Sequence, residues 1–164
     1  MAASVKVSGG KAWKKALNPY VENENPGVVV GALEGATYAM GPLAGELVAA
    51  NLARHEFGTE HIPARAPMRS TLAKMKGQWG KTLIALLKAN PGKIRDMFNA
   101  MGMQMAKDIQ QSFEDGLEPP LKEETVKRKE RMGYTAHAQK AVMLTGETQK
   151  SIEHEWKEDL GALL

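Results

Sequence analysis

The residues whose types and spacing most suggest chemistry are His55, Glu56 and His61. In one class of zinc hydrolase, two histidines four residues apart on a helix bind the metal, and a glutamate between them acts as the general base. Here the histidines are six residues apart, and Gly58 and Pro63 interrupt any helix that would carry them. The pattern therefore predicts no metal site.

Other catalytic arrangements are equally weak. His137 and His154 each lie apart from any nucleophile or acid that the sequence would pair with them. The stretch GALEG at 31–35 lacks the lysine and hydroxyl residue that follow a phosphate-binding loop. The chain has no cysteine, which excludes a thiol nucleophile, a disulfide and a thiolate metal site. We expect a protein that is not an enzyme and that carries no cofactor and no metal.

The most unusual stretch is 55–69, which reads HEFGTEHIPARAPMR. Pro63 and Pro67 each fix their own φ near –65° and push the preceding residue out of the α region. Arg65 and Arg69 alternate with these prolines. The pattern predicts a turn over the first five residues, followed by an extended arm whose arginines contact another surface.

Charge is segregated along the chain. The net charge is only +3, yet the stretch 61–95 contains eight lysines and arginines and no acidic residue. The remainder carries 14 basic and 19 acidic residues, a net charge of –5. Such segregation favours either complementary contacts between neighbouring copies or a basic face toward nucleic acid. A helix face that is simply solvated is the alternative.

Composition and length are those of one globular domain over 1–164, with 43% hydrophobic and 25% charged residues. The N-terminus lacks the apolar region of a signal peptide, and no apolar run reaches the roughly 18–20 residues that span a bilayer. We therefore expect no membrane association. Residues 1–27 are predicted to form an N-terminal strand–helix segment, and 158–164 a candidate flexible tail.

Apolar periodicity and turn residues predict an α+β fold, in which a small and mostly antiparallel sheet packs against two or three longer helices. The extended arm with its prolines and arginines would join this body. The predicted elements are a strand over 4–8, a helix over 11–17, a strand over 27–33, a third strand or hairpin return over 36–40, helices over 42–54, 71–89, 91–114 and 122–131, a turn or short helix at 144–147, and a strand over 152–157.

The helix predicted over 91–114 has the clearest apolar stripe. Its methionines permit an adaptable binding groove as an alternative, but the interpretation we prefer is core. At roughly 1.5–3 kcal/mol for each large side chain that is fully buried, such a stripe is a major source of stability. The stripe consists of Ile94, Met97, Phe98, Met101, Met105, Ile109 and Phe113.

The stretch 55–69 resembles the signature HEFGT-x-x-IPARPFMR of a family of small bacteriophage tail-completion and head–tail joining (neck) proteins. Further elements follow in the family's order, namely PPL at 119–121 with Thr125 and Lys129, and LTG at 144–146 followed by Ser-Ile at 151–152. Val-Gly at 30–31 and Tyr38 lie where the family has a strand and a tyrosine upstream of the signature. The resemblance spans about 28–157.

The chain also departs from the family pattern. It has Ala66-Pro67-Met68 where the family has Pro-Phe-Met, so the proline is shifted by one position and the aromatic residue is absent. Glu147-Thr148 stands where an apolar residue usually follows the Thr-Gly pair. The partner of the arm is therefore expected to differ in detail from that of other members.

The resemblance implies a structural virion protein that completes the head-proximal end of a phage tail and joins it to the head connector. Such a protein assembles as a homo-oligomeric ring, a hexamer by analogy with tail symmetry, around the channel that carries the DNA. Its partners would be other copies of itself, the tail tube or tail terminator protein, and the head connector proteins. It would reside in the tail and neck of the virion, after assembly in the host cytoplasm.

Two groups of residues are candidates for contacts in such a ring. Arg65 and Arg69 can form two-pronged pairs with carboxylates of a neighbouring subunit, with Glu56 orienting the arm; pairing within their own subunit, or exposure to solvent, is the alternative. The candidate interface with a subunit or partner consists of Glu56, Phe57, Arg65, Met68 and Arg69. The candidate lining of the DNA channel consists of Lys74, Lys76, Lys81 and Lys88.

Two other functions stay open. The basic stretch 61–95 permits a free nucleic-acid-binding module, although aromatic residues for base stacking are only 5% of the chain. The protein is alternatively a tail assembly factor that is not retained in the virion. The size of the purified protein distinguishes the first alternative from a ring, and mass spectrometry of virions tests the second.

Overall fold

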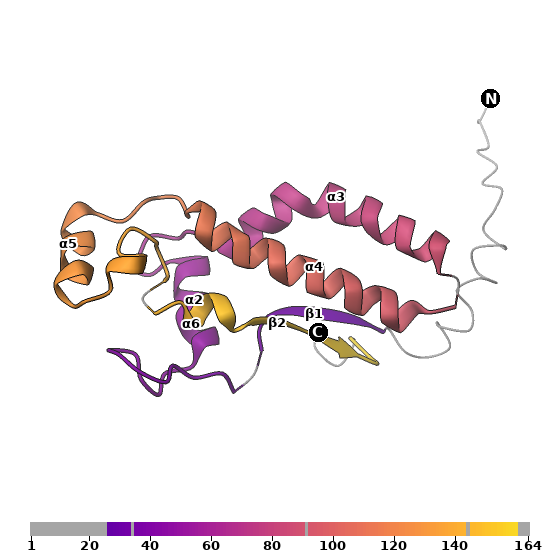
Figure 1. Cartoon of the computed structure of the whole chain (residues 1–164), viewed down its shortest axis with the longest axis horizontal. Coiled ribbons are helices and arrows are strands. Elements are labelled where there is room, and N and C mark those ends of the chain that lie inside the picture. The colour runs from indigo at the N-terminus through magenta and orange to yellow at the C-terminus, as the bar shows by residue number, and fades with distance from the viewer. Residues whose placement is uncertain (1–25, 34, 91, 144, 161–164) are drawn as a thin grey trace, which may run out of the picture.

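The structure is a computed structural model that describes residues 26–33, 35–90, 92–143 and 145–160. Three layers lie on one another along the length of the molecule: helix α3, helix α4 and a two-stranded sheet (Figure 1). The elements, in chain order, are β1 (Gly27–Ala32), α2 (Val48–Phe57), α3 (Pro67–Ala89), α4 (Ile94–Asp115), α5 (Glu123–Arg131), a 3-10 turn (Thr135–His137), α6 (Glu147–Lys150) and β2 (Ile152–Lys157).

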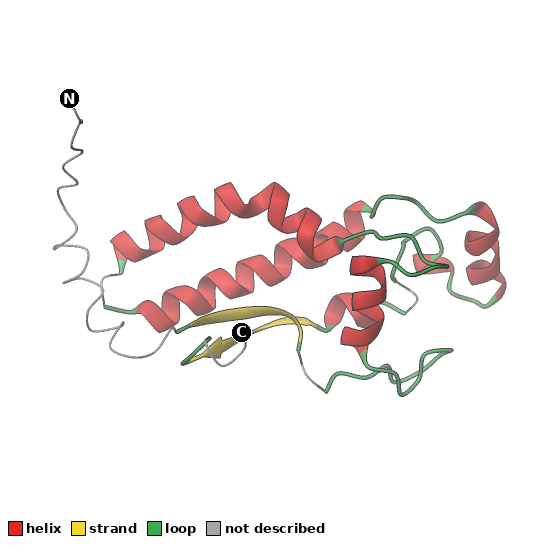
Figure 2. Cartoon of the chain, turned by 180° about the vertical axis from the view of Figure 1, so that it is seen from behind, coloured by secondary structure: helices red, strands yellow, loops and turns green. Residues whose placement is uncertain are grey.

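Viewed from behind, α3 and α4 form a long hairpin, and α5 lies at the opposite end of the molecule from the turn of this hairpin (Figure 2). Short α2 and α6 lie between the sheet and α5 (Figure 1). The fold is thus α+β with a small antiparallel sheet, which confirms the predicted class. None of the helices in the described ranges is long and apolar enough to cross a membrane.

The sheet pairs β1 with β2 in antiparallel register, from Gly27 opposite Lys157 to Ala32 opposite Ile152. Gly102 of α4 lies directly over this ribbon. A Cβ atom at that position would lie 2.5 Å from the Val28 Cγ2 atom, so that the sheet or the helix would have to shift. The absence of a side chain at this position therefore allows α4 to pack closely on the sheet.

The core lies mainly beneath α4. Phe113 is fully buried, and Met97, Met101 and Ile109 of the predicted stripe are each 3% exposed. The interpretation of the stripe as core is confirmed for these four residues, whereas Ile94, Phe98 and Met105 are only half-buried. The central cluster of buried residues consists of Leu52, Ala106, Ile109, Phe113, Leu117, Ala141, Met143 and Ile152.

One buried aromatic side chain of α3 forms a hydrogen bond to α4. Trp79 is 6% exposed, and its Nε1 donates a hydrogen bond of 2.6 Å to Asp108 Oδ2. Gln104 donates to the other carboxylate oxygen at 2.8 Å and so fixes the acceptor. Ile84, which lies roughly 140° around α3 from Trp79, stays about half exposed. The face of α3 that points away from α4 is therefore a solvent surface in the single chain.

Two predictions before α2 need correction. The segment 36–40 is not a third strand, because Thr37 and Tyr38 form only isolated bridges, to Leu47 and Ala44; these bridges belong to a chain that turns back on itself, as in the alternative of a hairpin return. The helix expected over 42–54 begins six residues later, at Val48, and continues to Phe57. Glycines at 41 and 45 adopt positive φ and turn the chain before the helix begins, so the proline at 42 does not start it.

The other long elements agree with the prediction to within a few residues. Helix α3 begins four residues before the predicted start at 71, and α4 begins three residues after the predicted start at 91. The predictions of a strand over 4–8 and a helix over 11–17 lie outside the described residues, as does most of the tail over 158–164.

Candidate functional site at the corner between α2 and α3

The signature stretch 55–69 forms the corner between α2 and α3. His55, Glu56 and Phe57 are the last turn of α2, which corrects the prediction of a turn over 55–59. The helix ends at Phe57, and Gly58 after it has a φ of 79°. A Cβ there would lie 2.9 Å from the Ala64 backbone nitrogen, so glycine is required both by its φ and by the closeness of the returning chain.

The loop after Gly58 folds back onto α2. Thr59 Oγ1 accepts hydrogen bonds from the backbone N–H groups of His61 and Ile62, at 3.3 and 3.0 Å, and so stabilises a tight turn. The N–H groups of Arg65 and Ala66 then both donate to the carbonyl oxygen of His55, at 2.8 and 3.2 Å. These bonds satisfy a carbonyl that the helix end leaves open. The predicted extended arm is therefore a short loop over 58–66, held against its own helix.

Helix α3 begins at Pro67 instead of in the predicted region around Thr71. Proline is well suited to this position, because its missing N–H would have no partner in a first turn. The residue before it, Ala66, has a φ of 44° in the left-handed region, which costs an L-amino acid with a side chain of the order of 1 kcal/mol. The corner carries this strain at the point where the chain reverses.

Glu56 caps the first turn of α3. Its carboxylate is buried, and it accepts hydrogen bonds from the backbone N–H groups of Met68 at 2.9 Å and Arg69 at 3.0 Å. These are two of the N–H groups that have no partner within the helix. The negative charge also lies at the positive end of the dipole of α3. Glu56 was predicted to orient the arm, and the structure shows it holding the start of the helix.

Arg69 completes a reciprocal arrangement between the two helix ends. Its Nε donates to Glu56 Oε1 at 2.9 Å, and its Nη2 donates to the backbone carbonyl oxygen of the same glutamate at the end of α2. Each helix end is therefore capped by a side chain from the other helix. Hydrogen bonds that involve a charged group contribute roughly 1.5–3 kcal/mol each, so this pair is a major support of the corner.

Arg65 connects the corner to the second sequence element of the resemblance. It is only 7% exposed, and its Nε donates a 2.8 Å hydrogen bond to the carbonyl oxygen of Pro119. Burial lowers the pKa of Arg65 from its usual value. The bonds of Arg65 and Arg69 are both within their own chain, which is the alternative to bridging that the sequence left open. For Arg65, burial leaves little of the guanidinium for a neighbouring subunit.

His55 is neutral at physiological pH. Burial, followed by the positive charges of Arg65 and Arg54, lowers the pKa of this histidine from 6.5 to about 4. Its Nδ1 atom is buried without a hydrogen-bond partner in the part of the chain that the structure describes. His55 lines a pocket of about 400 Å³ that also borders Asn51, Leu121 and Lys129.

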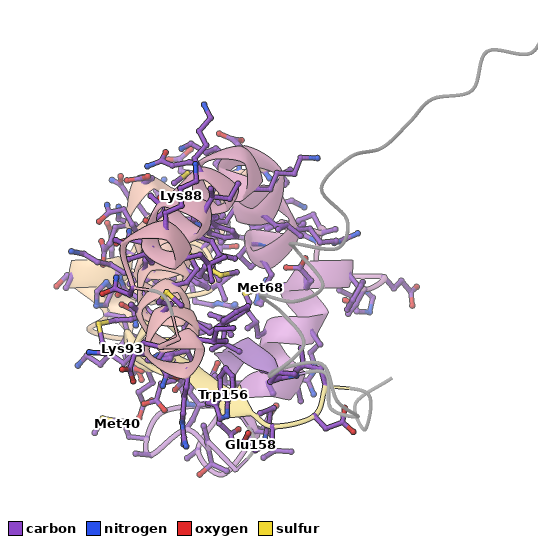
Figure 3. The ribbon with its side chains drawn as sticks, turned by 90° about the vertical axis from the view of Figure 1, so that its right-hand side faces the viewer. Met40, Met68, Lys88, Lys93, Trp156 and Glu158 are labelled. Atoms are coloured by element: carbon purple, nitrogen blue, oxygen red, sulfur yellow. The ribbon has the colours of Figure 1, made fainter. Side chains whose placement is uncertain are left out.

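The outer surface of the corner is formed by Phe57 and Arg69. Phe57 is 72% exposed, and the guanidinium of Arg69 lies 5.1 Å from the centroid of its ring. The Arg69 side chain itself remains 57% exposed although it is paired with Glu56. Met68, in contrast, is half-buried and packs against the central cluster, near Gly31 (Figure 3). Of the five candidate interface residues, Phe57 and Arg69 are therefore those that a partner can reach.

A buried chain of hydrogen bonds, which the sequence reasoning missed, joins the region before α2 to α6. Asn51 Nδ2 donates to the Tyr38 hydroxyl at 2.8 Å, and that hydroxyl donates to Thr148 Oγ1 at 2.8 Å. Thr148 in turn donates to the carbonyl oxygen of Val142 at 3.2 Å. Thr148 had been counted as a departure from the family pattern. Tyr38, which matches the tyrosine of the family pattern, was the one sequence signal for these hydrogen bonds.

Lys129 is a second buried residue whose role was missed. Its ammonium donates to the carbonyl oxygens of Lys140 at 2.8 Å, Met143 at 2.6 Å and His137. Burial lowers the pKa of Lys129 to about 8, and the three oxygens stabilise the charged form. Because every donor of the ammonium has a partner, Lys129 holds the loop over 137–143 onto α5.

The four lysines predicted to line a channel are all exposed on α3. Lys74, Lys81 and Lys88 are seven residues apart, so they lie on one face of the helix. Lys76 lies on a different side. No ion pair involves any of the four among the residues with a described position. The structure thus divides the predicted group into three lysines that share a face and one that does not.

In the described ranges, no three histidine, cysteine, aspartate or glutamate side chains lie together where they could hold a metal ion. Comparison of the chain with protein-family models, curated proteins and solved structures finds no significant match.

Proposed function

We propose that this protein is a structural subunit of a bacteriophage neck, which completes the head-proximal end of the tail and joins it to the head connector. In this proposal several copies form a ring, six by analogy with tail symmetry, around the channel through which DNA passes. The protein does no catalysis. The ring is held by exposed surfaces, and the signature residues at the corner give those surfaces their shape.

The observation that carries the proposal is that the separate sequence elements of the resemblance meet in space. Arg65 of the first element donates to Pro119 of the second. Leu121 of the second packs against the central cluster. Tyr38, upstream of both, bonds to Thr148 beside the third. Residues that match a family pattern by accident have no reason to bond to one another, so these contacts support the resemblance.

The corner offers the surface that we assign to a neighbouring subunit. Phe57 supplies exposed apolar area, and Arg69 lies against its ring with part of its guanidinium free. Aromatic residues and arginine are enriched among the residues that dominate binding at interfaces. Because Glu56 already fixes Arg69, little conformational entropy is lost when a partner binds.

Charge segregation supports a head-to-tail arrangement of copies. The basic residues of 61–95 lie on and around α3, while the acidic surplus belongs to the rest of the chain. A contact between two different patches of the same protein generates a ring when the rotation closes. Candidate acidic partners are Glu114, Asp115, Glu118, Glu123 and Glu124.

The test is the mass of the purified protein, measured by native mass spectrometry with and without isolated tail tubes. We expect a ring of several copies, either alone or on the tubes, and we expect Phe57→Ala to reduce it. Met103→Ala is the matched control, because Met103 is also a large, exposed apolar residue, at 64%, but lies on α4. Equal assembly of both variants would show that the corner is not part of the interface. A wild-type protein that stays monomeric in both conditions would contradict the proposed ring.

A free nucleic-acid-binding module is the second candidate, and the exposed lysines of α3 are the observation that favours it. A monomer or dimer that associates only with DNA, and never with tail tubes, would support this candidate instead. Mass spectrometry of purified virions separates the neck protein from an assembly factor that is absent from the particle.

A further inference from the structure

We infer that one face of α3, marked by Lys74, Lys81 and Lys88, binds the phosphate backbone of duplex DNA. The inference rests on the proposed function, because it places this face toward the DNA channel of the ring. Of the four lysines that the sequence predicted to line the channel, only Lys76 does not belong to this face.

The geometry of α3 defines the face. Trp79 points to α4, where it bonds to Asp108. At 100° per residue, Lys74, Lys81 and Lys88 lie roughly 140–180° around the helix from Trp79, and Lys76 lies only about 60° from it. Figure 3 looks along the helices and shows Lys88 toward the α3 side of the molecule and Trp156 toward the sheet. The three lysines are therefore on the outer side of the molecule.

The spacing of these lysines suits a linear array of negative charges. Seven residues of helix rise about 10 Å, so the three ammonium groups extend along about 20 Å. Duplex DNA carries one phosphate charge for each ~1.7 Å of its axis, so any position along it supplies partners. No acidic residue occurs from 61 to 95 to compete for the lysines.

The surface of α3 between the lysines lacks a side chain at one position. Gly77 lies on this face, and a Cβ atom there would have nothing within 4 Å among the described residues. Glycine within a helix costs about 1 kcal/mol relative to alanine, and packing within the described chain gives no compensation for that cost. A small residue at this position allows a bulky partner to approach the helix backbone closely.

A phosphate backbone fits this face better than an acidic protein surface does. Cores of protein interfaces are depleted in lysine and enriched in aromatic residues and arginine, as the corner at Phe57 is. The lysine face contains no aromatic residue and one large apolar residue, Ile84. Lysine ammonium groups on flexible stems bind phosphates without a fixed geometry, which suits contact that is independent of DNA sequence.

The experiment measures binding of the full-length protein to a fluorescent duplex of about 30 base pairs over a range of salt concentrations, since binding to phosphates weakens with salt. Three variants are compared with wild type: Lys81→Gln, Lys76→Gln and the triple change Lys74→Gln, Lys81→Gln and Lys88→Gln. Lys76→Gln is the matched control, because it removes the same charge from the same helix on a different side. The oligomeric state of each variant is measured without DNA.

The logarithm of the binding constant decreases linearly with the logarithm of the salt concentration. For each chain in contact with the duplex, we expect this slope to become shallower by about 0.9 for Lys81→Gln and by about 2.7 for the triple variant. Lys76→Gln should leave the slope unchanged. Absent or salt-independent binding by wild type overturns the inference, as does an equal loss for Lys76→Gln and Lys81→Gln. If the triple variant loses the ring without DNA, the face binds another subunit instead. If wild type forms rings but does not bind DNA, this inference is wrong, whereas the proposed function is not contradicted.

Discussion

Two neighbouring regions of the basic stretch use their positive charges in opposite ways. At the corner, Arg65 and Arg69 form hydrogen bonds within their own chain, to Pro119 and Glu56. On the outer face of α3, Lys74, Lys81 and Lys88 extend into solvent without an ion pair among the described residues. The contrast shows that a run of like charge in a sequence can contain both structural supports and an exposed binding surface.

The difference follows from side-chain chemistry. The planar guanidinium of arginine donates in fixed directions, so that of Arg69 can hold the carboxylate and the backbone carbonyl of Glu56 at the end of α2 at once. The lysine ammonium is strongly hydrated and flexible, so it remains in solvent unless three acceptors surround it, as they surround Lys129. Arginine therefore builds the corner, and lysine marks the face of α3.

The largest effect is expected for Glu56→Ala. This change leaves two N–H groups of α3 and the Arg69 guanidinium without their shared acceptor. Loss of one partner from a buried charged pair typically costs about 3–5 kcal/mol; because Arg69 is half exposed, we expect about 2–4 kcal/mol, measured by urea denaturation. Glu60→Ala, in the exposed part of the same loop, should change stability by less than about 0.5 kcal/mol. Equal losses would contradict the capping role of Glu56.

Lys129→Met should be the next most damaging change. It takes the ammonium donor from the carbonyl oxygens of Lys140 and Met143, and from that of His137, which still accepts from the N–H of Lys140. We expect a loss of about 2–3 kcal/mol in the free energy of unfolding. Lys127→Met on the exposed side of α5 is the control, since its contact with Glu123 is a surface ion pair worth less than about 1 kcal/mol. A Lys129 variant as stable as wild type would show that the ammonium does not hold the loop over 137–143.

Two glycines should respond to alanine with opposite signs. Gly58→Ala at the corner adds a Cβ 2.9 Å from the Ala64 nitrogen and requires a φ that alanine disfavours, so we expect a loss of about 1–3 kcal/mol. Gly77→Ala on the lysine face meets open space and should stabilise the helix by about 1 kcal/mol. Thermal denaturation of both variants measures the two signs, and a gain at Gly58 would contradict the geometry of the corner.

The pH dependence of the corner should come from His55. Its pKa is lowered to about 4 in the folded chain from 6.5, so the unfolded state binds more protons between these two values. The contribution of His55 to stability is therefore fully present above about pH 6.5 and is lost as the pH drops toward 4. His55→Gln should flatten this part of the stability curve, whereas His61→Gln, at an exposed position of the loop, should leave it unchanged. A curve that keeps its slope without His55 would assign the dependence to another group.

The sequence predicted the strongly periodic elements well, because their apolar residues repeat at the spacing that burial requires. Four of the seven residues of the α4 stripe are buried core, and β1 and β2 pair along the predicted strands. The start of α2 was misplaced because Pro42 resembles a first helical residue, while the glycines beside it turn the chain.

The corner was predicted less well, for a physical reason. Pro67 was interpreted as part of an extended arm, but proline is equally suited to the first turn of a helix. The choice between the two depends on Glu56, whose carboxylate supplies the cap from another helix. A contact of that kind has no signature in local spacing. The same holds for Lys129 and Thr148, whose partners lie in other segments of the chain.

The most direct test of the central proposal is electron cryo-microscopy of the intact neck of the phage particle. The account predicts a closed ring of copies of this chain between the tail tube and the head connector, with the Phe57 corner at the contact between subunits and the lysine face of α3 toward the DNA. A neck that lacks this protein, or that holds it in any arrangement other than a ring, would contradict the account.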